Sequence, residues 1–368
     1  MLKPIHYVSC SPALAACQRL MQKFSLWLCE ANVHAADITP DNLKARMPSH
    51  IEAEWLWKFL SRKTEGDTLL RRSCDIANLS NPEKQGLANW INAVTNLAQH
   101  FGPTPPPALP FQYPNGWASR NTSWTTFKNL LVAFYEVGFR EGLPYRADGL
   151  PTDIAVEQVT YEKFVTEFRN THKLDPHPDS REICVLCGGE LGKPEVDHWL
   201  HKASFPLLSI CDNNLLPICA DCNSGEDTKG QKPVHNTGDF TDWFHPYLRH
   251  PDGALRLNYV LPDFAVKCTS ASPTDQAKVD NLDKLLNLTH RWTLEFKAEY
   301  RKKQKELSDL KRRSRGPDDL AALQAWLTDY SDSLLDNEPD YEVHKVLSDA
   351  MLEPTRLEAW HRELQSLS

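Results

Sequence analysis

Two CxxC pairs, Cys184/Cys187 and Cys219/Cys222, constrain this chain more than any other feature, with 31 residues between the pairs. Each CxxC turn can direct two thiolates to one point, and two such turns complete a tetrahedral zinc site with no open position. A closed site of four thiolates stabilises a fold and does no chemistry. The alternative interpretation is four unrelated buried thiols, which the doubled CxxC spacing disfavours.

The segment between the pairs predicts two strands followed by a helix. Residues 195–200 are short and partly alternating, and residues 214–218 form a second strand-like run after the turn-prone residues 211–213. Asp221 is placed as the N-cap of a short helix. In such a unit we expect four polar side chains to converge on one face, namely Asp197, His198, Asn214 and Asn223.

These residues lie in the patterns DHxxxKxxFPxLS and NLxPxCxxCN, with Lys229-Gly230 downstream. The combination resembles the HNH endonucleases, which have a treble-clef-like ββα-metal fold stapled by zinc. It covers about 50 of the 368 residues. The tract 243–247 (WFHPY) is similar to HNH proteins of bacterial anti-phage systems.

The resemblance implies a role for each matching position. Asp197 and Asn223 hold a catalytic divalent cation, Mg²⁺ or Mn²⁺, and His198 is the general base. Asn214 fixes the loop that orients His198. Lys202 and Lys229 are expected to contact nucleic acid, although the family's CNxxK pattern would place its lysine at Glu226, three residues before Lys229.

Phosphodiester hydrolysis needs residues of these types. A hard cation on carboxylate and amide oxygens neutralises the charge that builds on the phosphate and the leaving oxygen. A neutral imidazole can take the proton of the attacking water near neutral pH. His201 is an alternative ligand or base, or else a surface histidine after the first strand.

Composition places the chain among soluble, cytoplasmic proteins. The N-terminus has no signal-peptide layout, no run of 18 apolar residues occurs, and no membrane association is expected. Ten cysteines without a signal peptide favour reduced thiols and a metal. Buried structural thiols are expected at the six cysteines outside the zinc set, which are Cys10, Cys17, Cys29, Cys74, Cys211 and Cys268.

Charge is unevenly distributed along the chain. The net charge is −8, and residues 181–232 hold five Lys or Arg against eight Asp or Glu. Residues 291–315 hold ten Lys or Arg against four acidic residues, whereas residues 316–368 hold three against twelve. The basic tract is either a solvated helix face or the surface that contacts phosphates, for which the candidates are Lys302, Lys303, Arg312 and Arg313.

Apolar spacing predicts helices over 11–60, 82–101, 122–142 and 161–172, a strand at 255–260, and a long helix from about 280 to 313. We therefore expect a mainly helical α+β chain with three domains: helical 1–172, a zinc-stapled HNH unit at 173–250, and mainly helical 251–368. The expected function is a DNA endonuclease in anti-phage defence. Its ATPase would be a partner, because the sequence has no GxxxxGK[ST] loop. The rival interpretation is a catalytically inactive zinc module that acts as a nucleic-acid- or protein-binding adaptor.

Overall fold

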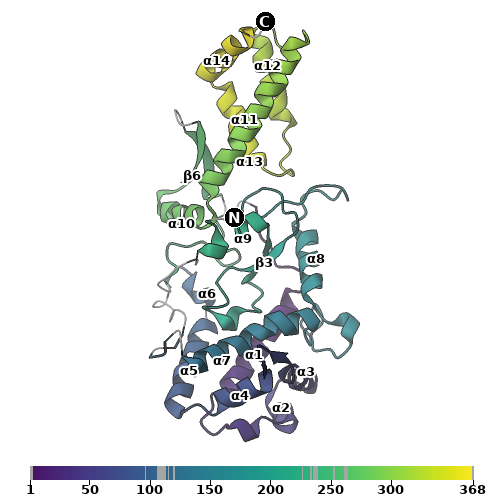
Figure 1. Cartoon of the computed structure of the whole chain (residues 1–368), viewed down its shortest axis with the longest axis vertical. Coiled ribbons are helices and arrows are strands. Elements are labelled where there is room, and N and C mark those ends of the chain that lie inside the picture. Colours follow the sequence, from purple (N-terminus) through teal and green to yellow (C-terminus); the bar gives the residue numbers. More distant parts are fainter. Residues whose placement is uncertain are drawn as a thin grey trace.

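The computed structural model describes residues 3–95, 97–105, 113–114, 116–118, 121–225, 227–232, 234, 239–251, 253–260 and 264–366. The molecule is elongated (Figure 1): N-terminal helices form one end, a small two-stranded unit lies in the middle, and C-terminal helices form the other end. The predicted mainly helical α+β class is confirmed.

The N-terminal end is a helical cluster that also contains a hairpin of two-residue strands, β1 (Lys63–Thr64) and β2 (Asp67–Thr68). Most of its α-helices begin at a side chain that caps the first turn; Thr39, Ser49, Thr68, Asn121 and Thr160 each accept a backbone N–H. The α-helices are α1 (Ser11–Leu28), α2 (Pro40–Arg46), α3 (His50–Leu60), α4 (Leu69–Ala77), α5 (Asn81–Thr95), α6 (Leu97–His100), α7 (Thr122–Ala133) and α8 (Tyr161–His172).

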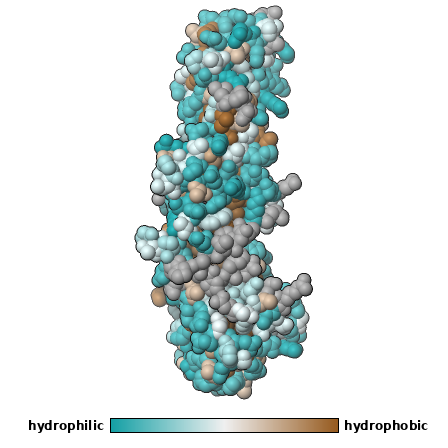
Figure 2. Space-filling model, turned by 90° about the vertical axis from the view of Figure 1, so that its left-hand side faces the viewer, coloured by the Kyte–Doolittle hydropathy of each residue, from teal (hydrophilic) through white to brown (hydrophobic). Residues whose placement is uncertain are grey.

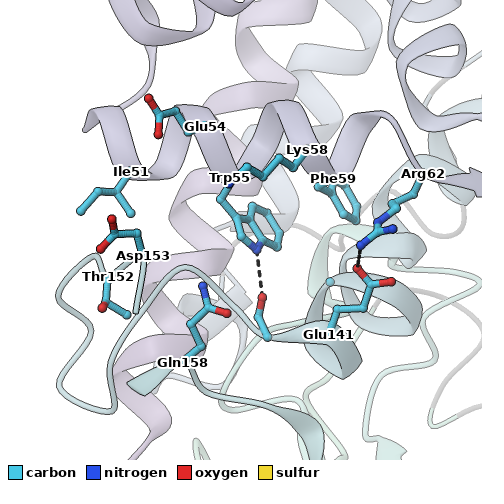
Figure 3. A pocket seen from close by; sticks show the side chains of 12 residues that line it. Ile51, Glu54, Trp55, Lys58, Phe59, Arg62, Glu141, Thr152, Asp153 and Gln158 are labelled. Carbon is cyan, nitrogen blue, oxygen red and sulfur yellow. Dashed lines mark hydrogen bonds and ion pairs between the residues drawn. The ribbon is translucent and has the colours of Figure 1, made fainter. Parts of the chain in front are cut away.

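The helix that contains α7 continues as a π-helix, η2 (Phe134–Phe139), which the sequence analysis did not anticipate. Figure 3 shows how this segment is held: the Trp55 indole N–H of α3 donates to the Gly142 carbonyl, 2.9 Å away. A Cβ on Gly138 would lie 3.1 Å from the Trp55 ring. Glycine at 138 therefore allows close packing of α3 against η2. The hollow beside Trp55 has a volume of about 420 Å³.

The central unit consists of β3 (Glu195–His198), β4 (Leu215–Ile218) and α9 (Ala220–Asn223). The two strands are antiparallel, with Asp197 opposite Leu216 and His198 opposite Leu215. The predicted strand–strand–helix order is confirmed. The N-cap prediction was wrong by two residues: α9 begins after Cys219, and Asp221 lies in its first turn.

The C-terminal end begins with a hairpin of β5 (Leu255–Val260) and β6 (Ala265–Ser270). The long helix predicted from 280 to 313 is two helices, α10 (Gln276–Leu286) and α11 (Leu288–Arg312). Asn287 between them adopts φ +53°, a left-handed conformation that ends a helix. The chain ends with α12 (Leu320–Ser333), α13 (Tyr341–Leu352) and α14 (Pro354–Gln365).

The face seen in Figure 2 is mostly hydrophilic, with small, separated hydrophobic spots. Within the described part of the chain, no helix combines the length and the apolar character needed to span a bilayer. Of the six cysteines outside the zinc set, Cys10, Cys17, Cys29 and Cys268 are buried, and Cys74 and Cys211 are half-buried.

Arg249 joins the N-terminal helices to the segment that follows the central unit. Its guanidinium donates to the carbonyls of His100, Phe101 and Gly102 at the end of α6, at 3.1–3.3 Å. It also donates to the carbonyls of Phe240, Thr241 and Trp243. A planar group with five donors can satisfy several carbonyls at once, which an ammonium cannot.

We therefore expect Arg249→Ala to lower the free energy of unfolding by about 2–3 kcal/mol, because several carbonyls lose their donor. Arg249→Lys should recover only part of the loss. Urea unfolding followed by circular dichroism measures the effect, with the exposed Arg313→Ala as the matched control. Equal midpoints for Arg249→Ala and the control would contradict this assignment.

Candidate metal centre

The four cysteines of the CxxC pairs come together in the central unit. Cys184, Cys187, Cys219 and Cys222 are all buried, and their Sγ atoms all lie within 4.8 Å of one another. The Sγ atoms of Cys187 and Cys219 are 3.8 Å apart. Tetrahedral Zn–S bonds of about 2.3 Å place neighbouring sulfurs about 3.8 Å apart, so a structural zinc ion fits this set.

Residues of α11 surround the cysteine cluster. The Arg291 guanidinium donates to Cys222 Sγ at 3.2 Å, and the Trp292 indole N–H donates to the Cys187 carbonyl at 2.9 Å. The Cys219 amide donates to Cys184 Sγ at 3.5 Å. Donors of this kind partly neutralise thiolate charge and orient the ligands. The first turns of α11 are therefore part of the cysteine site.

The alternation of β3 separates the expected site residues into two groups. Glu195 and Asp197 share one face of the strand. Glu195 contacts Asn223 of α9, and Asp197 contacts Lys229, which follows α9. His198 lies on the other face, against Tyr135 of η2. The convergence of all four polar side chains on a single face was therefore too simple an expectation.

His198 is held by a backbone carbonyl and an aromatic ring. Its Nε2 lies 2.9 Å from the Ser209 carbonyl oxygen, and the Tyr135 ring meets it edge-on at a centroid distance of 4.5 Å. Burial, with a further contribution from Lys202, lowers the pKa of His198 to about 3. The imidazole is therefore neutral near pH 7. A carbonyl can only accept a hydrogen bond, so Nε2 carries the proton and Nδ1 carries the lone pair.

Asn214 organises the loop that connects the two strands. Its Oδ1 accepts the Leu200 amide at 2.7 Å, and its Nδ2 donates to the carbonyls of Leu200 and Leu208 at 3.0 Å. The side chain is fully buried. Because Ser209 follows Leu208 directly, these bonds fix the carbonyl that contacts His198. The Ser209 hydroxyl donates to the Leu131 carbonyl of α7 at 2.9 Å and anchors the loop further.

Asn223 contacts Glu195 in this structure. Its Nδ2 donates to Glu195 Oε2 at 2.6 Å, and Glu195 precedes Asp197 by two residues on the same face. Asp197 is buried, and its Oδ2 has no hydrogen-bond partner apart from an ion pair with Lys229. Carboxylate and amide oxygens are the ligands that Mg²⁺ and Mn²⁺ prefer. The chemistry of these residues is thus compatible with a hard divalent cation.

Lys229, one of the expected nucleic-acid contacts, is buried and paired inside the protein. Its Nζ lies 2.7 Å from Asp197 Oδ2 and donates to the His198 carbonyl at 2.8 Å, and its side chain is 4% exposed. Lys202 is half-buried, pairs with Glu136 at 3.0 Å, and lies over the Tyr135 ring. His201 is exposed, as expected for a surface histidine after β3. Glu226 lies outside the described residues.

The expected nucleic-acid contacts on α11 differ in exposure. The side chains of Lys302 and Arg312 are 70% and 67% exposed, and Arg313 is also exposed. The Lys303 side chain is only 13% exposed, pairs with Glu306 at 3.1 Å and lies over the Tyr330 ring. Helix geometry places position 302 about 16 Å, and position 312 about 32 Å, beyond Arg291 along α11.

Two residues that line the site, Tyr135 and Glu195, were not predicted from the sequence. Glu195 could have been found, because period two places it on the face of Asp197. Nothing in the sequence links Tyr135 to the site, because it is 63 residues from His198 and lies in an apolar helix pattern. The WFHPY tract supports β4: the Tyr247 hydroxyl donates to the Leu215 carbonyl at 3.1 Å.

Among known proteins, this chain shows a partial similarity to a protein whose name states no activity. The chain is similar to protein ea31 of Escherichia phage lambda, with 30% identity over 166 residues, which is 39% of this chain and 54% of that protein. It thus spans about half the length of the curated relative that it matches. No protein-family model and no solved structure match the chain. The name of the phage protein states no activity, so a function must be argued from the site.

We expect Cys219→Ser to lower the zinc content and the stability of the protein together, because a structural zinc site contributes directly to folding free energy. Zinc measured by mass spectrometry and a thermal melt test this. Cys211→Ser is the matched control, since Cys211 belongs to the same unit but lies outside the cluster. A variant Cys219→Ser with unchanged melting, or a wild type without tightly bound zinc, would refute the zinc assignment.

Proposed function

We propose that this chain is a metal-dependent HNH-type endonuclease that hydrolyses phosphodiester bonds in DNA. The observation that carries the proposal is the neutral imidazole of His198, held by the Ser209 carbonyl next to Asp197 on a hairpin stapled by four cysteines. It matches the roles that the sequence motifs imply for these positions. Asp197 and Asn223 are the proposed ligands of the catalytic cation.

The chemistry would proceed through groups whose positions are described above. With Nε2–H bound to Ser209, Nδ1 of His198 is free to accept the proton of an attacking water. Asn214 keeps the loop in place, so the imidazole retains this orientation. When bound, Mg²⁺ or Mn²⁺ would supply neutralisation of phosphate charge. Zinc in the four-cysteine site has no open position and would play no part in hydrolysis.

A role in bacterial defence against phage, beside a partner ATPase, is the biological part of this proposal. It rests on the resemblance of the motifs, including WFHPY. An adaptor with an inactive site is the second candidate. The observation in its favour is that Asp197 is already neutralised by Lys229 and that His198 is 6% exposed.

Cleavage by the His198→Ala variant distinguishes the two candidates. We expect loss of at least about a hundredfold in the rate of plasmid cleavage with Mg²⁺ or Mn²⁺, because the general base is removed. Zinc content should be unchanged, since His198 is not in the cysteine set. His201→Ala is the matched control and should cleave normally. Equal cleavage by His198→Ala and wild type would move the role to His201, and an inactive wild type would favour the adaptor.

We propose that exposed cations at the C-terminal half of α11 contribute to DNA binding by contacting phosphates. Neutralising Lys302, Arg312 and Arg313 should weaken DNA binding uniformly across sequences. The slope of log affinity against log salt should become shallower by up to about 0.9 for each phosphate that the variant no longer neutralises. Lys303 is left intact because its ammonium lies over the Tyr330 ring.

The matched control for this experiment neutralises three exposed cations of the N-terminal end of the molecule, Lys44, Arg71 and Arg146. Fluorescence anisotropy at several salt concentrations measures both variants. An unaltered affinity and slope in the α11 variant would make this helix a solvated or partner-binding face.

A further inference from the structure

We propose that Lys229 is an internal counter-ion of Asp197, and that a divalent cation binds Asp197 only by displacing the Lys229 ammonium. The inference rests on the proposed metal site and assigns Lys229 a role other than phosphate contact. The ammonium is held by Asp197 Oδ2 at 2.7 Å and by the His198 carbonyl at 2.8 Å. It also lies over the Trp199 ring, 5.6 Å from the centroid.

Burial makes the two charges depend on each other. The side chains of Lys229 and Asp197 are 4% and 10% exposed. A buried carboxylate or ammonium without a compensating charge is strongly unfavourable, so each group needs a cationic or anionic partner at all times. The Lys229 ammonium is therefore the partner that compensates the Asp197 carboxylate before any metal arrives.

The same proximity opposes simultaneous binding. A divalent cation lies about 2.0–2.6 Å from its carboxylate oxygen. On Asp197 it would come within a few ångströms of an ammonium that is itself 2.7 Å from Oδ2. Coulomb repulsion at such a distance, away from bulk water, is large. Exchange of one cation for the other is the arrangement that avoids it.

The backbone that carries Lys229 is coupled to the other proposed ligand. Lys229 begins η5 (Lys229–Gln231), and Gly230 lies so close to α9 that a Cβ would be 2.0 Å from the Asn223 carbonyl oxygen. Glycine at 230 is therefore needed for the approach. A backbone shift that accompanies displacement of Lys229 would therefore also move Asn223, whose side chain donates to Glu195.

Direct binding of Mn²⁺ to the zinc-loaded full-length protein tests the exchange. Electron paramagnetic resonance counts free Mn²⁺ for wild type, Lys229→Met, Asp197→Asn and the matched control Lys232→Met. Lys232 lies in the same segment but pairs with Asp227. We expect Lys229→Met to bind Mn²⁺ at least tenfold more tightly, Lys232→Met to change affinity less than threefold, and Asp197→Asn to lose the site.

The outcomes separate this inference from the proposed function. If Asp197→Asn abolishes Mn²⁺ binding while Lys229→Met leaves the affinity unchanged, the exchange is refuted and the metal site stands. If neither the wild type nor any variant binds Mn²⁺, or if Asp197→Asn binds Mn²⁺ as tightly as wild type, both the exchange and the proposed metal site at Asp197 are refuted.

A measurement on wild type covers the case in which Lys229→Met does not fold. Acetic anhydride labels accessible amines, and mass spectrometry locates the label. Without Mn²⁺, Lys229 should resist labelling because its ammonium is buried; saturating Mn²⁺ should increase its labelling severalfold and leave Lys302 unchanged. Persistent protection of Lys229 in protein shown to have Mn²⁺ bound would overturn the exchange.

Discussion

The four-cysteine cluster is the interaction on which the middle of the molecule depends. Strands β3 and β4 have four residues each, and an isolated hairpin of that size is not stable in water. The cluster ties this hairpin and α9 to α11 through Arg291 and Trp292. Both chain ends are joined to the same knuckle: the Lys3 amide donates to the Val185 carbonyl, and the Asp340 amide donates to the Gly188 carbonyl. Four thiolates thus organise segments that are more than 150 residues apart.

In the fixed hairpin, the alternation of side chains along β3 directs His198 and Asp197 to opposite faces, and a different segment of the chain covers each face. The N-terminal helices cover the face of His198: η2 supplies Tyr135, and α7 supplies the carbonyl that anchors Ser209. The segment after β4 covers the face of Asp197, with Asn223 and Lys229. An uncharged imidazole and a charged carboxylate can therefore lie on neighbouring residues, because one strand places them in different surroundings.

Features set by local spacing could be predicted from the sequence, and features set by distant packing could not. The CxxC pairs, the two strands and the helix stripes follow from periods of two and 3.6 and from the ligand spacing of zinc. The break at Asn287, the π-helix at 134–139 and strand β6 were not predicted, because the apolar spacing that predicts helices marks none of them. At the site, the bonds of Asn214 hold the loop next to His198, whereas the ion pair of Lys229 with Asp197 was not predicted from the sequence. A sequence records that a lysine is present, and only the fold shows which carboxylate it meets.

Charge counting along a sequence has the same limit. The tract 291–315 is strongly basic, yet Arg291 donates to Cys222 and Lys303 lies over the Tyr330 ring. Arg249 and Lys229 are likewise committed to carbonyl and carboxylate partners inside the molecule. Such cations stabilise the fold and contribute little to long-range attraction of a polyanion, because each is already neutralised or desolvated at short range. The field that a polyanion would meet is set by the exposed cations of the tract, which begin at Arg301, about 15 Å along α11 from Arg291. Under the proposed endonuclease function, a duplex bound at these cations would have to extend along the helix to reach His198, and binding and hydrolysis would then be carried by different parts of the chain.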